Sequence, residues 1–130
     1  MGLAEKRAQK AAEEGWLPAR QREVAEISGA TVAYQVEWAS FEGDAKGIEW
    51  LEHNGPQQVS MALRGICRDA LGKEAIQAAL KTVVLTNVAS PDQKSLAFAD
   101  GVLTLRCAWA QSPGGRFNDR EIQACLEAGL

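Results

Sequence analysis

The chain has 130 residues, of which 46% are hydrophobic and 24% are charged. This balance is typical of one folded domain, here residues 1–130, and excludes a disordered chain. The net charge of −3 argues against nucleic-acid binding, which needs a concentrated basic face. No apolar run approaches the ~18 residues of a membrane helix. The N-terminal residues lack the apolar segment of a secretory signal, so we expect a cytoplasmic protein without membrane association.

The N-terminal part of the chain predicts two helices and a strand. Residues 3–14 are rich in Ala, Glu, Lys and Gln but have no apolar stripe, which indicates a helix that packs loosely on the domain, with residues 1–15 as its extent. A second helix begins near Pro18 and ends at Gly29, a residue suited to a helix C-terminus. Residues 31–38 alternate strictly between apolar and other side chains, which predicts a half-buried strand.

The central part predicts three helices. Asp44 is placed to cap a short helix, and Asn54-Gly55-Pro56 ends that helix and begins the next. This next helix has the clearest apolar stripe of the chain. Its stripe comprises Val59, Ala62, Leu63, Ile66, Cys67 and Ala70. After an interruption at Gly72, a further helix is expected to continue through Lys81.

The C-terminal part predicts three strands and a helix. Residues 82–88 form the first strand, and a hairpin around Asp100-Gly101 joins residues 94–99 to residues 102–109. The two-residue loop pairs Phe98 with Leu103 and Leu96 with Leu105. A final helix opens at Asn118 in a capping-box pattern.

The predicted order is α-α-β-α-α-α-β-β-β-α, which indicates the α+β class. We expect a four-stranded, mainly antiparallel sheet with the helices packed on one face. The first strand joins this sheet after three helices, and its neighbour, the second or the fourth strand, stays open. The three cysteines are an odd number without C-x-x-C spacing, which indicates reduced thiols at apolar positions.

The sequence contains no recognisable catalytic, nucleotide-binding or metal-binding motif, so we expect no cofactor and no metal site. The only histidine, His53, ends a predicted helix, where it has a favourable position near the negative end of the dipole. A glycine loop, Ser112-Pro113-Gly114-Gly115, precedes Arg116 and a helix N-terminus, and such an arrangement can hold an anion. His53 and Arg116 are therefore the candidate ligand-binding residues, although a plain connecting loop explains these glycines as well.

Residues 37–54 combine a local charge of −4 with three aromatic side chains, Trp38, Phe41 and Trp50. Aromatic anchors surrounded by acids are what a small protein would use to bind a basic protein partner. The alternative is that the aromatics belong to the core and the acids form a solvated rim. The candidate partner-binding residues are Glu37, Phe41, Glu42, Asp44, Glu49, Trp50 and Glu52.

These features favour a binding protein over an enzyme. The specific hypothesis is a bacterial protein of the immunity or antitoxin kind that neutralises a basic protein, such as a nuclease toxin. One alternative is a small-ligand binding domain or an enzyme that uses a pocket between sheet and helices. Another is a self-associating structural subunit, and the oligomeric state stays open.

Overall fold

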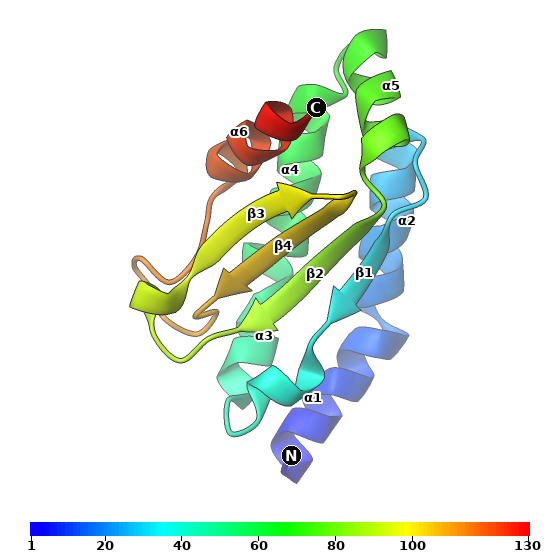
Figure 1. The fold of residues 1–130 in the computed structure, drawn as a ribbon. Helices are drawn as coiled ribbons and strands as arrows, with labels where there is room; N and C mark the ends of the chain where they lie inside the picture. The colour runs from blue at the N-terminus through cyan, green and yellow to red at the C-terminus, as the bar shows by residue number, and fades with distance from the viewer.

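One four-stranded sheet and a layer of helices make up the structure, a computed structural model that describes residues 1–130 (Figure 1). The strands are β1 (Ala33–Val36), β2 (Thr82–Asn87), β3 (Ser95–Ala99) and β4 (Val102–Cys107). The α-helices are α1 (Leu3–Glu14), α2 (Trp16–Ser28), α3 (Ala45–Asn54), α4 (Pro56–Ile66), α5 (Ala70–Ala79) and α6 (Asp119–Gly129). Two short 3₁₀ helices are η1 (Trp38–Phe41) and η2 (Pro91–Gln93). The α+β class, the four strands and the one-sided helix layer are confirmed.

The sheet has the order β1-β2-β4-β3 and is mixed rather than mainly antiparallel. β1 runs parallel to β2, and β2 runs parallel to β4. The short connections after β2 suggested an antiparallel meander, but β3 lies on the outer side of β4 and leaves the place beside β2 to β4. The neighbour of the first strand, left open by the sequence, is β2.

The β3–β4 hairpin has the predicted register. Phe98 pairs with Leu103, and Leu96 pairs with Leu105. Asp100 and Gly101 both have positive φ, as a two-residue hairpin turn requires. Local turn chemistry and the apolar face therefore specified this part of the sheet correctly.

The core lies between the sheet and the helices. Each strand directs alternate side chains toward the helix layer, where the apolar stripes of α4 and α6 meet them. The largest fully buried side chains are Trp109, Phe41, Ile48, Leu51, Leu63, Ile76, Leu80, Leu85, Leu103, Leu105, Ile122 and Leu126.

Three local features differ from the sequence prediction. β1 ends at Val36 rather than residue 38, because Trp38 begins η1. The boundary between α4 and α5 is set by Asp69, whose side chain accepts a hydrogen bond from the Gly72 amide, so Gly72 lies inside α5. Helix α1 contacts both α2 and α3, with Ala12 fully buried.

None of the helices combines the length and apolar character that crossing a membrane requires.

Candidate binding surface

The face of the sheet toward the viewer in Figure 1 carries no helix. Alternation along the strands and the strand register place twelve side chains on this face, in three rows of four. The last row includes Glu37, which continues β1 and whose amide donates to the Leu85 carbonyl. The rows are Ala33, Thr82, Val102 and Ala99; Gln35, Val84, Thr104 and Ala97; and Glu37, Thr86, Arg106 and Ser95. We call these twelve residues the open sheet face.

The centre of the open sheet face has side chains of restricted rotation, and its border on β3 has only small ones. Five of the six central positions carry β-branched side chains, namely Thr82, Val84, Thr86, Val102 and Thr104. β-branched side chains have restricted χ1 rotation, so they lose little conformational entropy when another surface packs on them. The outer strand β3 contributes only Ser and Ala to the face, which lets a partner backbone come close.

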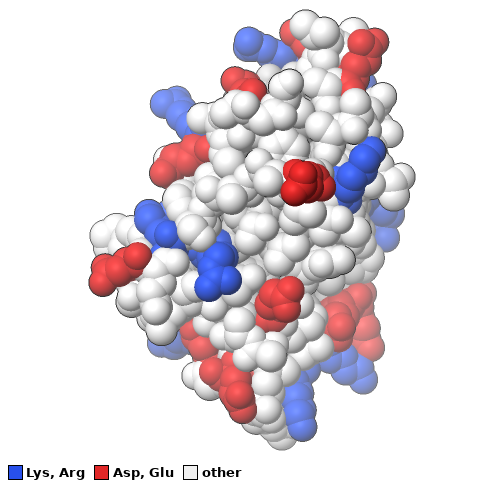
Figure 2. Space-filling view, viewed as in Figure 1, with Lys and Arg blue, Asp and Glu red and all other residues white.

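The open sheet face is accessible and mostly uncharged. Its residues on β1 and β3 are exposed, whereas those on β2 and β4, apart from the exposed Arg106, are partly buried by their neighbours in the sheet. In Figure 2, which has the same orientation as Figure 1, the middle of the sheet is free of charged side chains, and charged groups surround it. The face therefore resembles the central part of a binding surface, where charged residues are depleted.

The strand directions make an uncovered face unusual. β1, β2 and β4 run parallel, and only the edge strand β3 is antiparallel. Sheets made wholly of parallel strands occur almost only with both faces covered, so an open face on a largely parallel sheet is less common than on an antiparallel one. This chain supplies a cover for one face alone.

Glu37 and Arg106 are the two charged members of the open sheet face. Both are exposed, and they lie in the same row with Thr86 between them. At a strand spacing of about 4.8 Å, their backbones are roughly 10 Å apart. Neither side chain belongs to any of the five ion pairs of the chain. One acid and one base are therefore available to a partner.

The acidic and aromatic segment 37–54 does not form the single surface predicted from the sequence. Phe41 was predicted to be a partner-binding residue, but it is fully buried and cannot anchor a partner. The cause is η1, which turns Phe41 into the core, where its ring lies against Gly47 of α3. The centre of the Phe41 ring lies 6.3 Å from the centre of the Trp38 ring, and Trp38 is partly buried.

Two of the predicted acids have roles within the fold. Asp44 caps α3 by accepting a hydrogen bond from the Gly47 amide at 3.0 Å, and it also accepts one from the Asn87 amide group at 3.1 Å. Glu52 accepts a hydrogen bond from Nε of Arg20 at 3.1 Å. These contacts explain the positions of both carboxylates without a partner.

The exposed remainder of this segment is small. Glu42 and Glu49 are exposed, and Glu42 lies 3.6 Å from the N-terminal amine of Met1. Trp50 is 49% exposed, and the Arg116 guanidinium lies 5.5 Å from the centre of its ring. The exposed Trp50 therefore has a positively charged neighbour as well as acidic ones.

His53 and Arg116 lie near each other but do not converge on one site. The exposed His53 ring has its Nδ1 2.8 Å from Oε1 of Gln57 rather than against a carboxylate. Arg116 donates from Nε to the Trp109 carbonyl at 2.8 Å and from Nη1 to Oδ1 of Asn54 at 3.2 Å. The first contact lies within the loop between β4 and α6, and the second joins this loop to the end of α3.

The glycine loop borders a shallow polar cavity of about 320 Å³ that Arg116 lines and His53 does not. The α6 N-terminus beside it has its own partners: the Glu121 amide donates to Asn118, and the Asp119 amide donates to Gln58. Asp119 and Glu121 also place two carboxylates in the first turn of α6. These groups occupy donors that an anion would need and oppose its charge.

A cluster of charged and polar groups links α2, α3 and α4. Arg20 bonds both Glu23 and Glu52, and Arg64 lies 3.8 Å from Glu23. Burial tends to raise the pKa of Glu23, but the neighbouring Ser60 hydroxyl and the two guanidiniums outweigh it and hold the pKa below its ordinary value. No cavity opens onto Glu23, so this cluster serves the helix packing.

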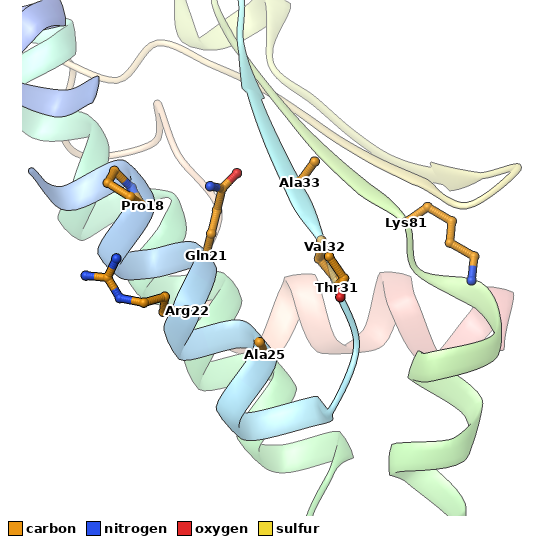
Figure 3. A pocket seen from close by; sticks show the side chains of 8 residues that line it. All are labelled: Pro18, Gln21, Arg22, Ala25, Thr31, Val32, Ala33 and Lys81. Carbon is orange, nitrogen blue, oxygen red and sulfur yellow. The ribbon is translucent and has the colours of Figure 1, made fainter. Parts of the chain in front are cut away.

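A groove of about 470 Å³ runs between α2 and the outer edge of β1 (Figure 3). Gln21 points from α2 toward the strand, and its Oε1 accepts the Tyr34 backbone amide at 2.8 Å. This contact occupies a donor that an added strand would use. Arg22 and Lys81 extend away from each other at its two sides. The groove is lined by no reactive nucleophile and by no two residues that could act together as general acid and general base.

The cysteines have buried or partly buried thiols. Burial raises the pKa of the Cys107 thiol to about 12 and also raises the pKa of Cys67 and Cys125. Thiols with raised pKa values are poor nucleophiles, because the thiolate is the reactive form. No group of three or more His, Cys, Asp or Glu residues is placed to hold a metal ion.

Comparisons of the chain with family models, with curated proteins and with solved structures found no match. A functional proposal therefore rests on the surfaces of this molecule, and the open sheet face is the one that its own helices leave uncovered. The sequence does not indicate this face, because its residues show only ordinary strand alternation and the parallel pairing of the strands is not local.

Proposed function

We propose that this chain is a protein-binding protein and that its partner packs on the open sheet face. The observation that carries the proposal is the parallel arrangement of β1, β2 and β4 with one face uncovered. The binding class is the one we expected from the sequence, and the binding surface is new.

The side chains of the open sheet face define the kind of partner. Rigid β-branched residues in the middle and small residues at the border suit a flat surface of a second sheet or a helix layer. The single Glu37 and the single Arg106 give the face no net charge. The partner surface is therefore mainly uncharged, and it places an opposite charge against each of these two residues. We expect such a complex in the cytoplasm.

Capture from extracts of the source cells tests the proposal. The bait variants are Thr104→Arg, in the middle of the open sheet face, and Ala124→Arg, which adds the same side chain at an exposed position of α6. We expect the wild-type and the Ala124→Arg chains to retain the same protein and the Thr104→Arg chain to lose it, because a buried unpaired charge opposes docking. Equal retention by all three chains, or specific retention by none, would contradict the proposal.

A second candidate function uses the exposed part of segment 37–54. Trp50 is half exposed, Glu42 and Glu49 are exposed, and exposed tryptophans are frequent anchors in interfaces. This geometry favours the narrower hypothesis of a bacterial immunity-type protein that neutralises a basic protein. Phe41 has no part in it, and Asp44 and Glu52 contribute charge without being free.

Charge reversal separates the two candidates. We expect Glu42→Lys with Glu49→Lys to slow association with a basic partner, with an effect that shrinks as salt is added. Trp50→Ala should instead speed dissociation. Association and dissociation rates measured on any captured partner give the result. If these variants bind as the wild-type does while Thr104→Arg fails, the open sheet face is the binding surface.

A further inference from the structure

We propose that the partner on the open sheet face is a second copy of this chain, related by a two-fold axis that runs along the strands between β2 and β4. This inference rests on the proposed function and names its partner. It is carried by the arrangement of large, small and charged side chains in the three rows of the face.

A two-fold axis of this kind reverses each row and lays it over itself, because β2 then faces β4 of the second copy and β1 faces β3. In the middle row, Val84 meets Thr104 of the other copy and Gln35 meets Ala97. In the first row, Thr82 meets Val102. These pairings set a longer side chain against a smaller one or two β-branched side chains against each other, as sheets packed at ~10 Å require. The corner pair of Ala33 with Ala99 is the exception, with two small side chains.

The third row supplies charge complementarity. Its order is Glu37, Thr86, Arg106 and Ser95, and reversal places Arg106 of one copy over Thr86 of the other. Glu37 is the strand neighbour of Thr86, so each Glu37 lies diagonally opposite an Arg106 of the other copy. The symmetry makes this contact twice. Neither residue has an ion-pair partner within its own chain, and the dimer gives both of them one.

The size of the face sets the strength of the dimer. Four strands span about 19 Å, and five residues along a strand span about 16 Å. Two such patches bury roughly 600 Å² in total, which is below the ~1,000 Å² of a stable specific interface and fits only a weak, transient one. The dimer should therefore be weak and depend on protein concentration, with a dissociation constant in the micromolar range or above, roughly 1 µM to 1 mM.

A charge swap measured by sedimentation equilibrium tests the inference. We expect the wild-type chain to show a monomer–dimer equilibrium, and Glu37→Arg or Arg106→Glu alone to raise its dissociation constant by about tenfold or more, because like charges then meet. The double variant should return to the wild-type value, since the two charges exchange places. Matched controls are Glu13→Arg on α1 and Arg120→Glu on α6, both exposed and outside the face, which should leave the equilibrium unchanged.

Two results would overturn the second copy as partner. One is a wild-type chain that stays monomeric up to about 1 mM, above the range set by the patch size. The other is a dimer that the single variants do not weaken or that the double variant does not restore. Unchanged melting temperatures ensure that the variants are folded, because exposed charges contribute little to stability. If the chain is monomeric yet Thr104→Arg loses a different captured protein, the proposed function stands and only the identity of the partner is wrong.

Discussion

Phe41 packs where a glycine leaves room for an aromatic ring. A β-carbon at position 47 would lie 3.1 Å from the Cδ1 atom of Phe41, tighter than ordinary van der Waals contact. Gly47 and Phe41 therefore fit together as one packing unit between η1 and α3. The adjacent Asp44 cap fixes the start of α3 and with it the position of Gly47.

Phe41→Ala should lower the free energy of unfolding by about 3–5 kcal/mol, because it removes a fully buried ring and leaves a cavity. Urea denaturation measures this change. Trp50→Ala serves as the control, since Trp50 is half exposed and should lose clearly less than Phe41. An equal or smaller loss at Phe41 would mean that its ring is not part of the core.

Glu23 links the stability of the helix layer to pH. Its pKa is held below the ordinary value of 4.5 in the folded chain. The carboxylate therefore contributes stability above pH 4.5, and this contribution is lost as the pH falls through the lowered pKa. Acidification should weaken the contact between α2 and α4, because it removes the charge that Glu23 of α2 presents to Arg64 of α4.

Glu23→Gln should make the free energy of unfolding less sensitive to acid than it is in the wild-type chain. Denaturation curves between about pH 6 and pH 3 give this comparison, since Glu23→Gln no longer binds the extra proton on unfolding. Glu13→Gln, on the exposed side of α1, is the matched control. Parallel pH profiles for the wild-type and Glu23→Gln chains would rule out this role of Glu23.

The burial of a single residue can be predicted from the sequence where the spacing of apolar residues alone decides it. The inward positions of β4 and the predicted stripe from Val59 to Cys67 are buried, whereas Ala70, the last member of that stripe, is exposed at the start of α5. Phe41 could not be placed, because its burial depends on a 3₁₀ turn and on Gly47 of the next helix. The same holds for Glu52, whose partner Arg20 is 32 residues away in the sequence.

Helix α1 rests on the domain through small side chains. Ala12 is fully buried and Ala8 is partly buried, and the helix contacts α2 and α3. Most of its other side chains face solvent, as its composition indicated. Alanine contacts bury little apolar area, so α1 adds a modest amount to stability.

Removal of residues 1–14 should lower the free energy of unfolding by about 1–2 kcal/mol, the scale of burying one or two methyl-sized groups. A chain that begins at Gly15, compared with the full chain by urea denaturation, provides the measurement. A loss above about 4 kcal/mol would show that α1 is a principal part of the core. No measurable loss would show that the Ala12 contact contributes nothing.

Elements joined by local signals were predictable, and distant pairings were not. The β3–β4 hairpin followed from Asp100-Gly101, because a two-residue turn fixes the register of the strands beside it. The parallel contact of β2 with β4 needs β3 to lie outside β4, and no turn residue encodes that choice. The helices α3 to α5 were found because their caps and breakers lie next to them in the sequence.

At the scale of the whole molecule, one layer of helices covers one face of a largely parallel sheet (Figure 1). The open sheet face could not be predicted, because Val84, Thr104 and their neighbours look like the outer face of any half-buried strand. Only the assembled sheet reveals that three strands run parallel beneath an uncovered surface. For the same reason the sequence could not show that tertiary contacts bury Phe41 and give Asp44 and Glu52 partners within the fold.

Site-specific photo-crosslinking from position 104 in the source cells tests the binding role of the open sheet face most directly. The same photoreactive residue at position 124, exposed on α6, is the control. We expect a cross-linked species from position 104 and none from position 124, and a species of twice the mass of the chain if the partner is a second copy. The absence of any cross-link specific to position 104 would contradict the proposal that a protein covers this face.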